Sequence, residues 1–181
     1  MDLLMKGGVM MRLLVFSDSH GSTRGMLEAF RRQTPPPDAV AFLGDGLRDV
    51  AYCDFGDVPI YAVEGNCDVS ALFYPVNATE ELVITLGGKR FFMAHGHMFG
   101  VKHDLFRIVA AAAAREADVV LFGHTHMPFE KYYPAGENEL GVFLKKPLYL
   151  FNPGSVGGYG GSFGTVTVDK SGAVLLSHGS L

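Results

Sequence analysis

The chain has 181 residues, of which 48% are apolar, so it suits a single domain with a substantial core. A formal net charge of −4 gives no general electrostatic reason to bind nucleic acid or an anionic membrane, and neither is expected as a partner. The two cysteines, Cys53 and Cys67, are too few for a disulfide framework and fit a reducing, cytoplasmic location.

The first half of the chain alternates between predicted strands and helices. Residues 1–10 are expected to form a loose extension, which leaves 11–181 as one domain. Strands are predicted at "RLLVF", "AVAFLG" and "PIYAV", which are short apolar runs that end in polar clusters. A helix is predicted over "STRGMLEAFRRQ", capped by Ser22 and with Met26 and Phe30 on one face, and a shorter helix over "LRDVAYCD".

The second half is richer in strand patterns. The run "ELVITLGGKRFFMA" predicts two strands joined at Gly87 and Gly88 as a hairpin. A helix with an apolar stripe is predicted over "HDLFRIVAAAAARE", followed by a strand at "DVVLF". Residues 127–150 are punctuated by glycine and proline, and "PAGENELG" is expected to be an exposed loop. The strand "LYLF" and the hairpin "GTVTVDKSGAVLLS" complete a mixed α/β layered domain.

Polar residues gather where the predicted strands end, and each cluster has a glycine beside a polar residue. Loops at strand ends of layered α/β folds converge on a crevice, and glycine lets backbone approach an ion or a phosphate closely. Asp18 and His20 lie two residues apart, so strand alternation would send both side chains to one side. The clusters contain Asp18, His20, Asp45, Asn66, His95, His97, His124 and His126.

Taken singly, each of these residues has a simpler explanation. A lone histidine is more often a surface or core residue without function, and that interpretation is kept for His103 and His178. Asp45 alone would be a turn aspartate. Together, however, five of the seven histidines fall in glycine-containing clusters beside two aspartates and an asparagine, which a random arrangement rarely produces.

The chemistry of this set indicates metal binding. Carboxylates, an amide oxygen and imidazoles without a thiolate cluster suit a divalent ion such as Mn, Fe, Ni or Zn, and Mn is favoured. Seven ligands are too many for one tetrahedral zinc and fit two ions that share a bridging carboxylate. Such a pair can clamp the oxygens of a phosphoryl centre and deprotonate a bridging water.

The ordered motifs "SDSHG", "GDG", "GNCD", "AHGH", "GHTHMP" and "NPGSV" resemble those of the calcineurin-like metallophosphoesterases, most closely the small YfcE-type phosphodiesterases. This resemblance runs from about Met11 to the C-terminus. It implies an α/β fold in which a two-sheet β-sandwich is flanked by helices in four αββα layers. The implied ligands are Asp18, His20 and His126 for the first metal, Asp45 as the bridge, and Asn66, His95 and His124 for the second.

The implied function is that of a dinuclear metal-dependent phosphodiesterase, in which a metal-bridging hydroxide attacks a small phosphodiester substrate. Two alternatives stay open: a phosphomonoesterase or nucleotidase with the same chemistry, and a non-catalytic scaffold of the same fold. Intact residues at all seven ligand positions argue against the scaffold. Specificity is expected in loops around Phe99, 129–139 and 157–163, and homo-oligomer formation is left open.

The proton donor for the leaving group is less defined, although Asp45 and Asn66 are expected to serve catalysis directly. Many larger members of the superfamily have a histidine where this chain has Cys67. A neutral thiol is a poor substitute for imidazolium, and Cys67 could equally fill space beneath the metals. His97 could supply the proton instead, or could hydrogen-bond a ligand.

Three further polar residues are expected to stay outside the chemistry. Asn152 and Ser155 of "NPGSV" are assigned a structural role, because an Asn-Pro-Gly turn needs no catalytic explanation. At Asp49, one helical turn after Asp45, replacement by asparagine is expected to have only a mild effect.

Overall fold

The structure is a computed structural model that describes residues 10–68, 76–158 and 160–181. Strands and helices alternate in the first half, as predicted, and antiparallel strands follow. The elements are β1 (Met11–Phe16), α1 (Thr23–Arg31), β2 (Ala39–Phe42), α2 (Leu47–Ala51), β3 (Ile60–Val63), β4 (Ala78–Thr79), β5 (Glu81–Leu86), β6 (Lys89–Ala94), the 3₁₀ turn η2 (His97–Phe99), α3 (Phe106–Ala114), β7 (Val119–Phe122), β8 (Pro128–Tyr133), β9 (Gly136–Glu137), β10 (Phe143–Leu144), β11 (Leu148–Pro153), β12 (Ser162–Val168) and β13 (Val174–Ser180).

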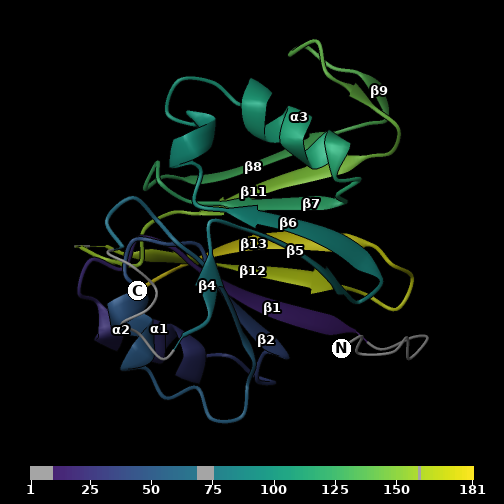
Figure 1. The fold of residues 1–181 in the computed structure, drawn as a ribbon. Helices are drawn as coiled ribbons and strands as arrows, with labels where there is room; N and C mark the ends of the chain where they lie inside the picture. Colours follow the sequence, from purple (N-terminus) through teal and green to yellow (C-terminus); the bar gives the residue numbers. More distant parts are fainter. Residues whose placement is uncertain (1–9, 69–75, 159) are drawn as a thin grey trace.

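Two sheets form the centre of the fold. One has the strand order β13-β12-β1-β2-β3-β4 and the other β5-β6-β7-β11-β8. In Figure 1, α1 and α2 lie on the outer side of the first sheet and α3 lies on the outer side of the second. The predicted four-layer αββα sandwich is therefore confirmed.

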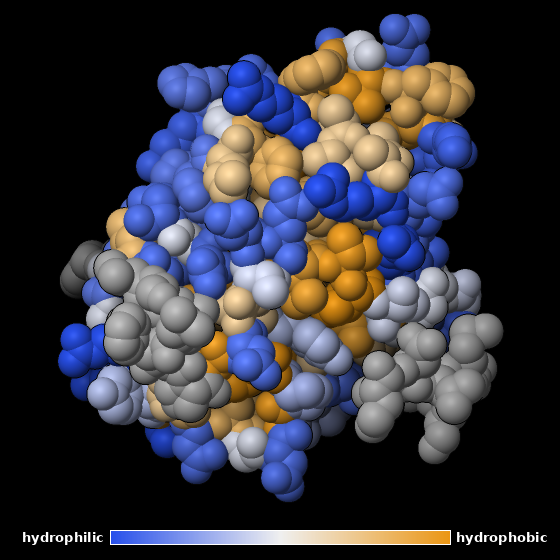
Figure 2. Space-filling view, in the orientation of Figure 1, coloured by the Kyte–Doolittle hydropathy of each residue, from blue (hydrophilic) through white to orange (hydrophobic). Residues whose placement is uncertain are grey.

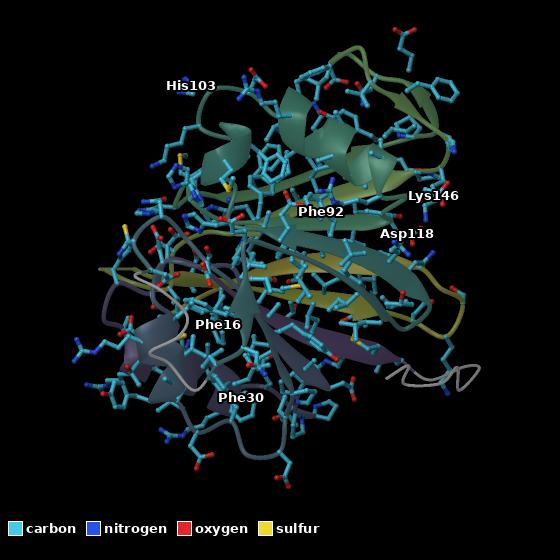
Figure 3. All side chains as sticks on the ribbon, in the orientation of Figure 1. Phe16, Phe30, Phe92, His103, Asp118 and Lys146 are labelled. Carbon is cyan, nitrogen blue, oxygen red and sulfur yellow. The ribbon has the colours of Figure 1, made fainter. Side chains whose placement is uncertain are left out.

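The central strands are apolar on both faces because both faces are covered. In β1, Leu13 and Val15 pack in the core between the sheets, whereas Leu14 and Phe16 pack in the core that contains α1 and α2. Phe92 of β6 belongs to a third core, under α3 (Figure 3). Figure 2 shows hydrophobic residues on this face between the two sheets and around β9, with hydrophilic residues over much of the rest.

The local structure departs from the sequence-based expectations at the start of α1 and at β8, and the predicted extension cannot be compared. Ser22 occupies the N-cap position of α1, but within the described part of the chain its side chain makes no capping hydrogen bond. The strand β8 has no predicted counterpart, yet it pairs with β11 over its full length. The predicted extension, apart from the exposed Met10, lies outside the described residues. None of the described helices is long and apolar enough to cross a membrane.

The topology brings the predicted site together. Strands β1, β2 and β3 run parallel in one sheet, and β6, β7 and β11 run parallel in the other. The carboxyl ends of each set therefore lie at one edge. The two edges meet, because the His124 N–H donates to Asp18 and the His95 ring donates to the carbonyl of Leu43, each bond joining one sheet to the other.

Candidate metal centre

Six of the seven predicted ligands form two compact groups. Within each group the ligand atoms lie within 4.8 Å of one another. The seventh, Asn66, is exposed and lies in the turn after β3, beside Cys67, whose N–H donates to Asp45 Oδ1 over 2.7 Å. The groups have the composition that the resemblance implies: Asp18, His20 and His126 in one, and Asp45, His95 and His124 in the other.

The backbone at this site is strained. A positive φ costs a residue other than glycine roughly 1–3 kcal/mol, and such residues cluster at functional sites. Strand β1 ends at Phe16, so left-handed turns, and not strand alternation, aim Asp18 and His20 at the site. Among the described non-glycine residues, those with positive φ are Glu116 and five predicted ligands: Asp18 (53°), His20 (42°), Asp45 (59°), His124 (67°) and His126 (62°).

Asp18 has one oxygen held by the protein and one left for a ligand. Its Oδ2 accepts from the Ser17 hydroxyl over 2.5 Å and from the His124 N–H over 3.0 Å. Its Oδ1 is buried and has no hydrogen-bond partner among the described residues, but lies 3.1 Å from His126 Nε2 and 4.0 Å from His20 Nε2. A buried carboxylate oxygen without a partner is costly, and a cation held at this point would compensate it.

His95 presents a lone pair to the same site. Its Nδ1 donates to the carbonyl of Leu43 over 2.6 Å, because a carbonyl oxygen can only accept. In the neutral ring, Nε2 is therefore unprotonated and faces Asp45 Oδ2 at 3.4 Å and His124 Nδ1 at 3.2 Å. A hydrogen bond of this kind from the outer nitrogen is typical of metal-binding histidines.

The ionisation of His124 and Asp45 suits metal ions, whereas His95 must lose a proton to bind one. Burial and the neighbouring His95 lower the pKa of His124 to about 4, which keeps its ring neutral. Burial raises the pKa of Asp45, but hydrogen bonds from His95 and Cys67 outweigh it and hold this pKa well below its usual range. Burial lowers the pKa of His95, but Asp45 and Asp18 raise it overall, so without a cation the ring holds a second proton at Nε2, which a metal ion would displace. Anionic carboxylates beside imidazoles fit divalent cations.

His97 and Cys67, the two candidate proton donors, differ in exposure. The His97 ring lies 5.5 Å from that of His95, and its buried Nδ1 has no partner in the described part of the chain. Burial and the charge of His95 lower the pKa of His97. Cys67 is exposed, and the interpretation that it fills space beneath the metals stays a prediction. A hydrogen bond with Asp45 raises the pKa of Cys67 and keeps its thiol neutral.

Two carboxylates that the sequence does not assign to the site hold its loops. Asp49 Oδ2 accepts from the Ser19 hydroxyl at 2.6 Å and from the Gly21 N–H at 2.7 Å, and the mild effect expected of Asp49→Asn stays a prediction. Asp68 accepts from four backbone N–H groups in two ligand loops. For Asp68, the only signal in the sequence is its place at the end of "GNCD".

The residues expected to be structural make structural contacts. The Asn152 side chain donates to the carbonyl of Gly123 over 2.9 Å, and the Ser155 hydroxyl donates to the carbonyl of Asp18 over 2.7 Å. His178 stacks on Phe151, with ring centroids 4.6 Å apart. His103 lies in the loop before α3 (Figure 3) and belongs to neither ligand group.

Known proteins share both the sequence pattern and the fold. Residues 11–171 match the calcineurin-like phosphoesterase superfamily domain. Phosphodiesterase YfcE of Escherichia coli K12 is 30% identical over 202 aligned positions, which cover 95% of this chain and 96% of that protein. The probable metallophosphoesterase YsnB of Bacillus subtilis strain 168 is 30% identical over 146, covering 81% and 75%. The solved structure of a predicted phosphoesterase from Streptococcus pneumoniae TIGR4 has a TM-score of 0.65 and 26% identity, covering 96% of this chain and 99% of that one.

Proposed function

Since the chain belongs to the calcineurin-like phosphoesterase superfamily, we propose that it is a dinuclear metal-dependent phosphodiesterase. The observation that carries this proposal is the adjacency of the two ligand groups. His95 Nε2 lies 3.4 Å from Asp45 Oδ2 and 3.9 Å from Asp18 Oδ1, so the groups share one site. Two ions in dinuclear hydrolases typically lie ~3.5–4 Å apart, and adjacent ligand groups are what such a pair requires.

The candidate ligands fall into one set for each of the two ions. Asp18, His20 and His126 would hold one, and His95, His124 and Asn66 the other, with Asp45 shared. When bound, the ions would lower the pKa of water enough to supply a nucleophile at neutral pH, and would polarise the phosphoryl oxygens. Asp45 suits the shared position because it is buried and held by the Cys67 N–H.

Several finer features belong to the proposal. Mn²⁺ is the favoured ion, with Ni, Fe or Zn as substitutes, because the site combines imidazoles with carboxylates. A small phosphodiester is the proposed substrate, and the net charge of −4 weighs against long polyanions such as nucleic acid. The cytoplasmic location and any self-association stay predictions.

A metal-reconstituted activity panel tests this function. Exhaustively chelated protein is expected to be inactive, Mn²⁺ to restore turnover, and Mg²⁺ to serve less well because it avoids imidazole-rich sites. The panel compares bis(p-nitrophenyl) phosphate, p-nitrophenyl phosphate and cyclic nucleotides. Faster turnover of the monoester would favour the phosphomonoesterase alternative. Metal binding without turnover of any ester would favour the scaffold.

The exposed thiol at position 67 predicts a preference for good leaving groups. A positioned general acid contributes ~10²–10⁴-fold, chiefly when the leaving group is poor. Activated aryl diesters should therefore react far faster than alkyl diesters. Because Cys67 is exposed, a larger ring has room there, and Cys67→His should raise the alkyl rate more than the nitrophenyl rate. Single-turnover kinetics on matched diesters measures both.

The contrary result has a definite meaning. Equal chemical-step rates for alkyl and nitrophenyl diesters in the unmutated protein would show that another acid already acts. His97 is the residue to test then, because its ring lies 6.1 Å from that of His124. His97→Ala would in that case slow the alkyl substrates selectively.

A further inference from the structure

Asp68 makes an unusual set of contacts just after β3. Its Oδ1 accepts from the backbone N–H groups of Gly46 and Leu47, each over 2.9 Å. Its Oδ2 accepts from the N–H of Asp45 over 2.8 Å and from that of Gly65 over 2.9 Å. Both carboxylate oxygens are thus occupied by backbone donors, and Asp68 holds two loops together without belonging to the ligand set.

The two loops that Asp68 joins carry ligands of the proposed metal pair. The loop after β2 carries Asp45, whose φ of 59° must be held by its surroundings. The loop after β3 carries Asn66. Hydrogen bonds to an ionised carboxylate are stronger than neutral ones, so one side chain can fix both segments of backbone.

The two loops are packed so closely that there is no room for a side chain at Gly65. A Cβ added to Gly65 would lie 2.1 Å from Asp45 Oδ1 and 2.4 Å from Asp45 N. The Cys67 N–H also donates to Asp45 Oδ1. A small shift of one loop against the other would therefore move Asp45 directly.

We propose that Asp68 is a positioning residue that sets the affinity of the second metal ion by holding the Asp45 and Asn66 loops together before the ion binds. This inference rests on the proposed function for the identity of the two ions. Asp68 fixes two of the four ligands assigned to the second ion, Asp45 and Asn66, but only Asp45 among those of the first. Loss of Asp68 should therefore lower the affinity for the second ion more than the affinity for the first.

The test is Asp68→Asn in the full-length protein. This change keeps the shape of the side chain but replaces one acceptor oxygen with an amide donor, which then faces two backbone N–H groups. Asp169→Asn is the matched control, because Asp169 Oδ1 also accepts backbone N–H groups, from Ser171 over 2.8 Å and Ala173 over 2.9 Å, in the turn between β12 and β13. Calorimetric titration of each chelated protein with Zn²⁺ measures both affinities.

For Asp68→Asn we expect the second ion to bind ~10–100-fold more weakly, the range seen when a group that orients a metal ligand is removed. The first ion should be affected less, and Asp169→Asn should leave both affinities unchanged. Wild-type affinities for both ions in Asp68→Asn would overturn the proposal. The titration does not depend on turnover. A wild type that binds two ions but cleaves no phosphoester would therefore contradict only the proposed function.

A second measurement decides the matter if Asp68→Asn does not fold. In the wild type, hydrogen exchange followed by NMR reports on the N–H groups of Gly46, Leu47 and Gly65 that Asp68 accepts. They should be protected in the chelated protein, before any metal is added. Protection that develops only after Zn²⁺ is added would show that the ion orders the loops, and would overturn the proposal.

Discussion

Asp45→Asn is expected to reduce phosphoester turnover by more than the ~10–100-fold that loss of a group orienting a metal ligand causes. Asp45 is buried, and its Oδ2 lies 3.4 Å from His95 Nε2. The amide has no negative charge to share between two ions, and its NH₂ group would face either the Cys67 N–H or the metals. Turnover and metal content after desalting should therefore fall together.

The exposed Asp57 provides the control for this substitution. Asp57→Asn removes the same charge from the surface of the same half of the domain and should leave turnover and metal content unchanged. If Asp45→Asn kept a metal stoichiometry and a rate near those of the wild type, the assignment of Asp45 as the bridging ligand would be wrong.

Gly65→Ala should lower both the stability of the fold and the affinity for metal, although Gly65 contributes no ligand atom. The added Cβ would lie 2.1 Å from Asp45 Oδ1, a distance that forces the Asp45 loop to move. Overpacking of this kind typically costs ~1–3 kcal/mol of unfolding free energy. Metal affinity should fall as well, because the displaced group is the carboxylate proposed to be shared by the two ions. Thermal denaturation and metal titration measure the two effects separately.

Gly88→Ala separates loss of stability from loss of metal. Gly88 lies in the turn between β5 and β6 with a φ of +77°, and a Cβ there would meet no described atom within 4 Å. Alanine in a left-handed conformation costs roughly 1–2 kcal/mol, so the control is also destabilised. Its metal affinity should not change. Metal affinity as high in Gly65→Ala as in Gly88→Ala would contradict the proposed contact.

The layers and the grouping of ligands could be predicted from sequence for different reasons. Strands such as β1 are apolar on both faces because each face is covered, and short apolar runs signal that directly. The ligand groups followed from ordered motifs. The local reason given for Asp18 and His20 was wrong, however, because both lie beyond the strand in left-handed turns. Such turns are set by tertiary contacts.

The residues that support the ligands could not be predicted. Asp49 accepts a hydrogen bond from Ser19, which lies 30 residues earlier in the chain, and no pattern in the sequence marks such a pair. Asp68 likewise accepts hydrogen bonds from backbone N–H groups, and no residue type in the sequence marks these as its partners. Strand β8 was missed because it is an edge strand that begins at Pro128 and alternates exposed with half-buried residues, which resembles a polar loop.

Catalysis by this protein is proposed to require two metal ions in one site. The most direct measurement is a titration of chelated wild-type protein with Mn²⁺, in which bound metal and turnover of bis(p-nitrophenyl) phosphate are determined on the same samples. We expect two ions per chain at saturation and a rate that rises with the binding of the second. Full turnover with one ion bound, or with none, would contradict a requirement for two ions.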